Sequence, residues 1–149
     1  DLSDTRLNVA KRMGAEITIN PLNSDVKEVI MDNTDGQGVD ISFEAVGNTP
    51  ACVQSLENIK VGGTSIWLGQ GKKTVEIGML DIVTRELSVS GSFTYGLEDF
   101  KSAVEMLNSG SIDPAPIISE EVPMEQAAEW FEKLKRPEEL VKVILKEEE

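Results

Sequence analysis

The feature that most constrains the fold is a repeated alternation between helix-like and strand-like segments. Four apolar runs have the length of buried strands: Glu16–Asn20, Val39–Val46, Thr64–Gly69 and Leu87–Phe93. They contain adjacent apolar residues, a pattern typical of parallel strands that are covered on both faces. The sequence therefore predicts an α/β fold built on a doubly wound parallel sheet. Such a sheet binds its ligand at the carboxyl ends of its strands.

Helix-like segments separate these runs. Apolar residues at helical spacing, with capping residues before them, predict helices at Asp4–Met13, Val26–Met31, from Thr49 onward, Met79–Thr84, Leu97–Asn108 and Met124–Leu134. Ser3 is the expected cap of the first helix, Ser24-Asp25 cap the second, and Thr49 caps the third with Pro50 at its first position. Val61-Gly62-Gly63 is expected to be a turn. Two further short strands are expected at Thr74–Ile77 and Leu140–Leu145, and the alternation ends near Tyr95.

The composition excludes several kinds of function. The 149 residues carry a formal net charge of -13, and binding to nucleic acid needs clustered Lys and Arg, so no nucleic-acid partner is expected. No apolar run is long enough to cross a bilayer, and no membrane association is expected. The single cysteine, Cys52, and the absence of histidine exclude an internal disulfide, a Cys/His zinc site and His-based catalysis. This cysteine usage fits a reducing, cytoplasmic location.

Four residues near predicted strand ends are candidates for ligand binding. In dinucleotide-binding folds an acidic residue after the second strand accepts hydrogen bonds from the adenosine ribose, and Asp1 fits that role; the alternative is an ordinary helix-entry residue. Arg6 lies one to two turns into the following helix, where its side chain could reach back to Asp1. Gly47 and Gly69 each end a predicted strand, either to leave room for a ligand or simply to form a turn.

Other motifs carry less information. Gly69-Gln70-Gly71-Lys72-Lys73-Thr74 does not form a phosphate loop, because the pattern needs a glycine at Ile66 and a hydroxyl at Lys73. Cys52 is expected in the first turn of a helix as a packed residue, with a thiol activated by the helix dipole as the alternative. Spacing alone identifies no catalytic acid, base or nucleophile.

Short motifs occur in order along the whole chain: Asp1-Leu2-Ser3-Asp4-Thr5-Arg6-Leu7, Ala10-Lys11-Arg12-Met13-Gly14-Ala15, Phe43-Glu44-Ala45-Val46-Gly47, Gly62-Gly63-Thr64, Gly91-Ser92-Phe93-Thr94-Tyr95, Ile112-Asp113-Pro114-Ala115-Pro116-Ile117-Ile118 and Lys142-Val143-Ile144-Leu145-Lys146. In this ordered set the chain resembles the zinc-dependent medium-chain alcohol and polyol dehydrogenases, with sorbitol, butanediol and threonine dehydrogenases the most similar. The resemblance implies a partial Rossmann-type NAD-binding domain at residues 1–95. Residues 96–149 would then be the C-terminal segment of the substrate, or catalytic, domain.

The same resemblance implies roles for particular residues. Asp1 would bind the adenosine ribose of NAD, with Arg6 beside it. The residues that would run along the cofactor are Val46, Gly47, Leu68, Gly69, Gln70, Phe93 and Thr94. Lys142 could approach the pyrophosphate, and Tyr95 would face the substrate. Thr74–Ile77 corresponds to an edge strand used for subunit pairing, which implies a homo-oligomer.

Two positions depart from the family pattern. Thr94 stands where sorbitol dehydrogenases have an arginine that touches the polyol, so the identity of the substrate stays open. Glu120 stands where many relatives have histidine.

The resemblance also implies that machinery lies outside this sequence. The family's catalytic zinc ligands and glycine-rich loop precede the segment that matches, so the chain is expected to be a fragment of a longer enzyme, inactive alone. The expected activity of the intact enzyme is zinc-assisted hydride transfer between a secondary alcohol or polyol and NAD. A non-enzymatic nucleotide-binding or assembly module is the alternative, and a methyltransferase that holds its cofactor ribose through Asp1 is a third possibility.

Overall fold

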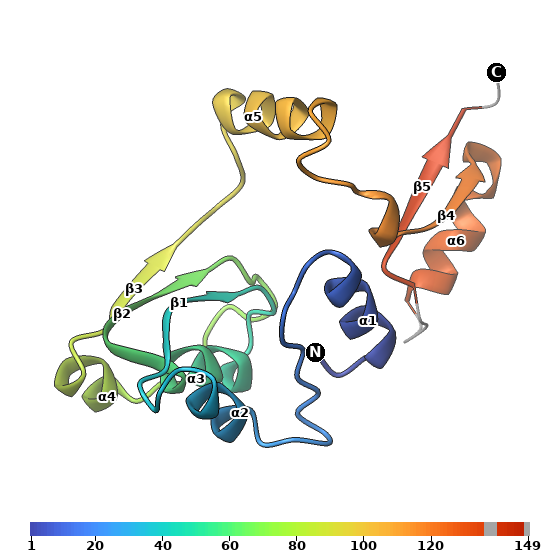
Figure 1. Cartoon of the computed structure of the whole chain (residues 1–149). Helices are drawn as coiled ribbons and strands as arrows, with labels where there is room; N and C mark the ends of the chain where they lie inside the picture. Colours follow the sequence, from blue (N-terminus) through green and yellow to red (C-terminus); the bar gives the residue numbers. More distant parts are fainter. Residues whose placement is uncertain (136–139, 148–149) are drawn as a thin grey trace. The chain divides into compact units, whose positions relative to one another are not determined.

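The computed structural model describes residues 1–135 and 140–147 and divides into two compact units (Figure 1). Asp25–Tyr95 form the sheet unit, and Asp1–Ser24 together with the described part of Gly96–Glu149 form the terminal unit. Among the described residues, no helix combines the length and apolar character that crossing a bilayer requires.

The sheet unit is built on three parallel strands, which confirms the predicted class of fold. These are β1 (Val39–Glu44), β2 (Ile59–Trp67) and β3 (Ser88–Gly91), in the order β1-β2-β3. Phe43 pairs with Ile66, which in turn pairs with Ser90. Because the strands are parallel, their carboxyl ends meet at one edge of the sheet. This edge is the place where the fold class puts a ligand.

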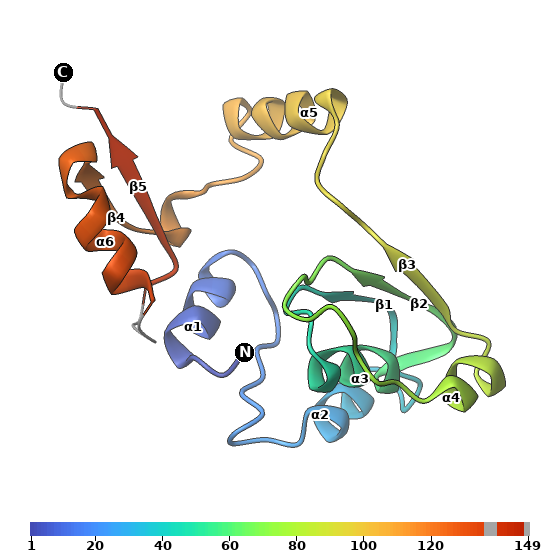
Figure 2. The same cartoon turned by 180° about the vertical axis from the view of Figure 1, so that it is seen from behind.

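Three helices belong to the sheet unit. The first is α2 (Val26–Asp32), α3 (Thr49–Glu57) joins β1 to β2, and α4 (Met79–Thr84) comes before β3. Asp25 caps α2 through Oδ1, which accepts hydrogen bonds from the amides of Lys27 and Glu28 at 2.9 and 3.1 Å. Figure 2 shows α2 and α3 on the same side of the sheet, as Figure 1 does.

The core of the sheet unit lies between the sheet and α3. Leu56, Ile59 and Leu87 form a buried cluster, and Ile59 has no exposed surface. Residues that pack against this cluster are Val39, Trp67, Ile77 and Ile82. Full burial of such a side chain contributes about 1.5–3 kcal/mol. The cluster therefore fixes the sheet against its helices and keeps the strand ends in place.

A network of hydroxyl groups complements this apolar core. Ser65 is fully buried and donates to the Ser55 hydroxyl at 2.9 Å, while Ser42 donates to the Ser65 hydroxyl at 2.9 Å. The indole N–H of Trp67 donates to the hydroxyls of Ser55 and Ser65 at 3.2 and 3.0 Å. Buried polar groups cost free energy unless they are paired, so this network fixes how α3 packs on β1 and β2.

The terminal unit begins with α1 (Asp4–Arg12), and Ser3 is its N-cap as predicted. Its later part contains α5 (Leu97–Asn108), the 3-10 turns η1 (Ala115–Ile117) and η2 (Met124–Gln126), and α6 (Ala127–Leu134). Two parallel strands, β4 (Ile118–Pro123) and β5 (Lys142–Lys146), pair through Val122 and Leu145. The sequence analysis predicted β5 to within two residues but missed β4.

Several local predictions are wrong. Glu16–Asn20 and Thr74–Ile77 are not strands, because neither segment pairs with a strand among the described residues. The N-cap of α3 is Asn48 and not Thr49, since Asn48 Oδ1 accepts from the Ala51 amide at 2.9 Å. Val61-Gly62-Gly63 lies inside β2, where the register with β1 shifts, so this segment is an irregularity in a strand and not a turn.

Candidate functional site

The carboxylate of Asp1 is held by the guanidinium of Arg6. The Arg6 Nε donates to both carboxylate oxygens, at 3.0 and 3.1 Å, and Nη2 donates to Oδ1 at 2.8 Å. The backbone amide of Ser3 also donates to Oδ1 at 2.8 Å. Both charged side chains remain accessible, with 40% of the Asp1 side chain and 44% of the Arg6 side chain exposed. The predicted reach of Arg6 back to Asp1 is confirmed.

The contacts around Asp1 also show which residue caps α1. The hydroxyl of Ser3 accepts a hydrogen bond from the Arg6 amide at 3.3 Å, so Ser3 and not Asp1 caps α1. Among the described residues, the Oδ1 atom of Asp1 accepts three hydrogen bonds, whereas Oδ2 accepts only the one from Arg6 Nε. An ionised carboxylate oxygen accepts about two hydrogen bonds, so Oδ2 has capacity for a ligand.

The turn after β1 is organised by a buried carboxylate that the sequence analysis did not single out as a site residue. Glu44 is 3% exposed, and its Oε1 accepts hydrogen bonds from the amides of Val46 and Gly47, both at 2.7 Å. Its backbone carbonyl accepts from the amides of Leu68 and Gly69 at 2.7 and 3.1 Å. One residue therefore connects the turns at the ends of β1 and β2.

The two glycines at these strand ends are required by close backbone contact. A Cβ added to Gly47, where φ is +76°, would lie 2.3 Å from the Gly71 nitrogen and 2.6 Å from the Gln70 nitrogen. A Cβ added to Gly69 would lie 2.1 Å from the Gly47 nitrogen and 2.5 Å from Glu44 Oε2. Contact between the turns themselves thus explains both glycines, whether or not a ligand lies across the sheet.

Cys52 lies in α3 beneath this edge and is 2% exposed. Burial raises the pKa of its thiol, and the negative charge of Glu44 raises this pKa further. Both effects favour the protonated thiol, which is a poor nucleophile. The interpretation of Cys52 as a packed residue is therefore confirmed, and the alternative of an activated thiol is wrong.

The other candidate residues are exposed. Val46 is 59% and Leu68 42% exposed, and Gln70 is also exposed, so side chains beside the paired turns can meet a ligand. Phe93 and Tyr95, which follow β3, are 76% and 72% exposed. Thr94, between them, has a φ of +57°, a left-handed conformation that is rare for a β-branched residue.

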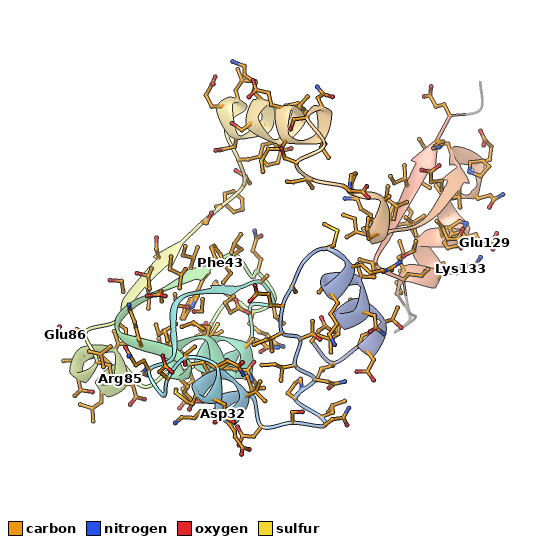
Figure 3. All side chains as sticks on the ribbon, in the orientation of Figure 1. Asp32, Phe43, Arg85, Glu86, Glu129 and Lys133 are labelled. Carbon is orange, nitrogen blue, oxygen red and sulfur yellow. The ribbon has the colours of Figure 1, made fainter. Side chains whose placement is uncertain are left out.

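The structure gathers the candidates into separate groups. Val46, Gly47, Leu68, Gly69 and Gln70 meet at one edge of the sheet unit. Asp1 and Arg6 meet in the terminal unit, where Lys142 is exposed at the first position of β5. The sequence pattern did not point to Glu44. Its signal was a charged residue at the last position of β1, where it is buried beside the exposed Phe43 (Figure 3) and needs partners.

The described residues contain no group of three or more His, Cys, Asp and Glu side chains that could hold a metal ion. The sheet edge presents apolar side chains, and the Asp1–Arg6 pair presents hydrogen-bonding groups. They do not supply a metal centre.

Comparison with known proteins identifies the family. Residues 1–109 match the family described as zinc-binding dehydrogenase. The chain belongs to this family. Membership favours an enzymatic scaffold over a non-enzymatic module and over a methyltransferase.

A reductase and a dehydrogenase are among the proteins that resemble the chain over most of its length. D-xylulose reductase A of Aspergillus niger is 30% identical over 139 residues, which cover 91% of this chain and 39% of that protein. L-Idonate 5-dehydrogenase (NAD(P)(+)) of Escherichia coli is 34% identical over 125 residues, covering 83% of this chain and 35% of the relative. The chain thus spans well under half of the length of these relatives.

Solved structures of two dehydrogenases share the fold. The structure of Escherichia coli L-idonate 5-dehydrogenase superposes with a TM-score of 0.85 at 31% identity, covering 97% of this chain and 41% of that one. The structure of 2R,3R-butanediol dehydrogenase from Bacillus subtilis gives a TM-score of 0.88 at 25% identity, covering 99% of this chain and 42% of that one.

Proposed function

We propose that the intact protein containing this chain transfers a hydride between a secondary alcohol or polyol and NAD, and that this chain contributes the grip on the nicotinamide cofactor. Support comes from membership of the zinc-binding dehydrogenase family and from relatives named D-xylulose reductase A and L-idonate 5-dehydrogenase (NAD(P)(+)). Zinc, when bound, polarises the alcohol oxygen. Its ligands would come from chain outside this sequence, because the described residues hold no suitable group. No residue of this chain is proposed as catalytic.

The observation that carries the proposal is the geometry of Asp1. Arg6 fixes the orientation of the carboxylate, and Oδ2 keeps capacity to accept a hydrogen bond from a ribose hydroxyl. A carboxylate in this role repels the 2′-phosphate of NADP, so NAD would be preferred. Arg6 acts in the opposite direction, since a guanidinium attracts phosphate. The balance between these two neighbouring charges would set the cofactor preference.

The remaining assignments follow the family pattern. Residues 1–95 would form part of the NAD-binding domain, and residues 96–149 would return to the substrate domain. Val46, Gly47, Leu68, Gly69, Gln70, Phe93 and Thr94 would contact the cofactor. Lys142 is exposed and carries the positive charge that a pyrophosphate needs, and Tyr95 would face the alcohol.

We also propose that the protein is a cytoplasmic homo-oligomer with no nucleic-acid or membrane partner. Thr74–Ile77 has no strand partner among the described residues. Because this segment is not a strand in the single chain, it would become one only by pairing with the same segment of a second copy. The high negative charge supports the absence of a nucleic-acid partner.

The proposal is tested by cofactor preference in the full-length protein that carries this sequence. Asp1→Ala removes the acceptor for the ribose hydroxyl and the charge that repels a 2′-phosphate. We expect kcat/KM for NAD to fall by about tenfold, the equivalent of one to two hydrogen bonds, and the preference for NAD over NADP to shrink or reverse. Asp40→Ala, an exposed aspartate in β1, is the matched control and should leave the preference unchanged. An unchanged preference in Asp1→Ala would refute the ribose assignment.

A further inference from the structure

Glu44 accepts backbone hydrogen bonds from the turns at both strand ends. Its Oε1 accepts hydrogen bonds from the amides of Val46 and Gly47, both at 2.7 Å. Its backbone carbonyl accepts from the amides of Leu68 and Gly69 at 2.7 and 3.1 Å. Its other carboxylate oxygen, Oε2, is buried without a hydrogen-bond partner among the described residues. A buried carboxylate is costly unless it is paired, so a residue that only filled space here would be apolar.

The direction of these amides has a chemical consequence. Turns and helix ends bind anions through backbone N–H groups that point toward the ligand. The N–H groups of Val46 and Gly47 instead point into the protein, onto Glu44 Oε1. The side chain of Val46 is exposed and can contact a ligand, whereas the N–H groups of Val46 and Gly47 are already used by Glu44. Such a surface suits a sugar or an aromatic ring and not a phosphate.

The proposed function already places the turns at Val46-Gly47 and Leu68-Gly69 along the cofactor. Resting on it, we infer that Glu44 is a positioning residue that sets these two turns against each other, so that binding of the uncharged part of the dinucleotide beyond its diphosphate depends on Glu44. Glu44 itself does not touch the cofactor, because Oε2 is buried and a Cβ on Gly69 would lie 2.5 Å from it. It acts by holding the amides that shape the surface.

The experiment measures the Kd values of NAD and of ADP by calorimetry for the full-length protein and two variants. ADP contains the adenosine and diphosphate but lacks the second ribose and the nicotinamide. Glu44→Ala removes the acceptor, and we expect the Kd for NAD to rise at least tenfold while the Kd for ADP stays within about twofold. Glu44→Gln retains an oxygen that accepts both amides, and both of its Kd values should stay within about twofold of the wild type.

Each outcome is decisive. Equal weakening of NAD and ADP in Glu44→Ala would show general structural damage and overturn the inference, as would unchanged binding of both. If Glu44→Ala does not fold, Glu44→Gln still tests the claim, because a tenfold loss of NAD affinity in that variant contradicts positioning by hydrogen bonds. If the wild-type protein binds neither NAD nor ADP, the proposed function itself is refuted. This result differs from every result that would refute only the role of Glu44.

Discussion

The sheet edge and the Asp1–Arg6 pair present candidate binding groups in opposite ways. At the sheet edge, a buried carboxylate and the closely packed backbones of Gly47 and Gly69 determine how the two turns meet. At the start of α1, two accessible side chains form an ion pair that can rearrange or accept a ligand. Substitutions at the sheet edge should therefore cost stability, whereas substitutions in the pair should mainly change ligand preference.

The largest loss of stability is expected from substitution of Gly69. A Cβ there would lie 2.1 Å from the Gly47 nitrogen, so the two turns would have to separate. We expect Gly69→Ala to lower the free energy of unfolding by about 4 kcal/mol, measured by urea denaturation of the full-length protein. Gly91→Ala at the end of β3 is the matched control, because nothing lies within 4 Å of its added Cβ. Equal stability of the two variants would contradict close contact between the turns.

A smaller effect is expected in the ion pair. Exposed ion pairs contribute about 0–1 kcal/mol, so Asp1→Ala should change the free energy of unfolding by less than about 1 kcal/mol while it alters cofactor preference. Glu98→Ala, which breaks the exposed pair between Glu98 and Lys101, is the control for an ion pair that has no proposed ligand. A loss above about 2 kcal/mol in Asp1→Ala would show that Asp1 is structural.

The smallest expected effect is a change in the pKa of Asp40, an exposed carboxylate in β1. A hydrogen bond from Lys60, followed by the charge of Lys60, lowers the pKa of Asp40 below its usual value of 3.8. A folded-state pKa below the unfolded one stabilises the protein above the unfolded pKa, and this contribution is lost as the pH falls through the folded value. In Lys60→Met the pKa of Asp40 should rise toward 3.8 in a carboxyl NMR titration. An unchanged pKa would exclude the ion pair in solution.

The parts of the fold that sequence predicted well depend on local chemistry. The bounds of α4 and α5 match the predicted Met79–Thr84 and Leu97–Asn108. Helical hydrogen bonds and caps lie within the segment itself, so its own residues contain the necessary information.

Strands were predicted less well, because a strand needs a partner elsewhere in the chain. Glu16–Asn20 has a suitable apolar pattern but pairs with no strand among the described residues, so it is not a strand. The opposite error occurred at β4, whose centre carries Glu120 and Glu121. Pairing with β5 makes this segment a strand despite its charges.

In the candidate site too, local contacts were predicted from sequence and contacts between distant segments were not. The reach of Arg6 to Asp1 follows from helix geometry and was predicted. The role of Glu44 depends on amides from two turns that are far apart in sequence. A charge at the end of a strand indicates that partners are needed, but it does not indicate which amides supply them. The reason for Gly47 and Gly69 was likewise visible only once their backbones were seen in contact.

The most direct test of the account is a crystal structure of the full-length protein with NAD bound. We expect a hydroxyl of the adenosine ribose within about 3 Å of an Asp1 carboxylate oxygen. We also expect a sugar or ring of the cofactor, and not its diphosphate, against Val46 and Gly47. A nucleotide that leaves Asp1 paired only with Arg6, or that places its phosphates over the Val46-Gly47 turn, would contradict the account.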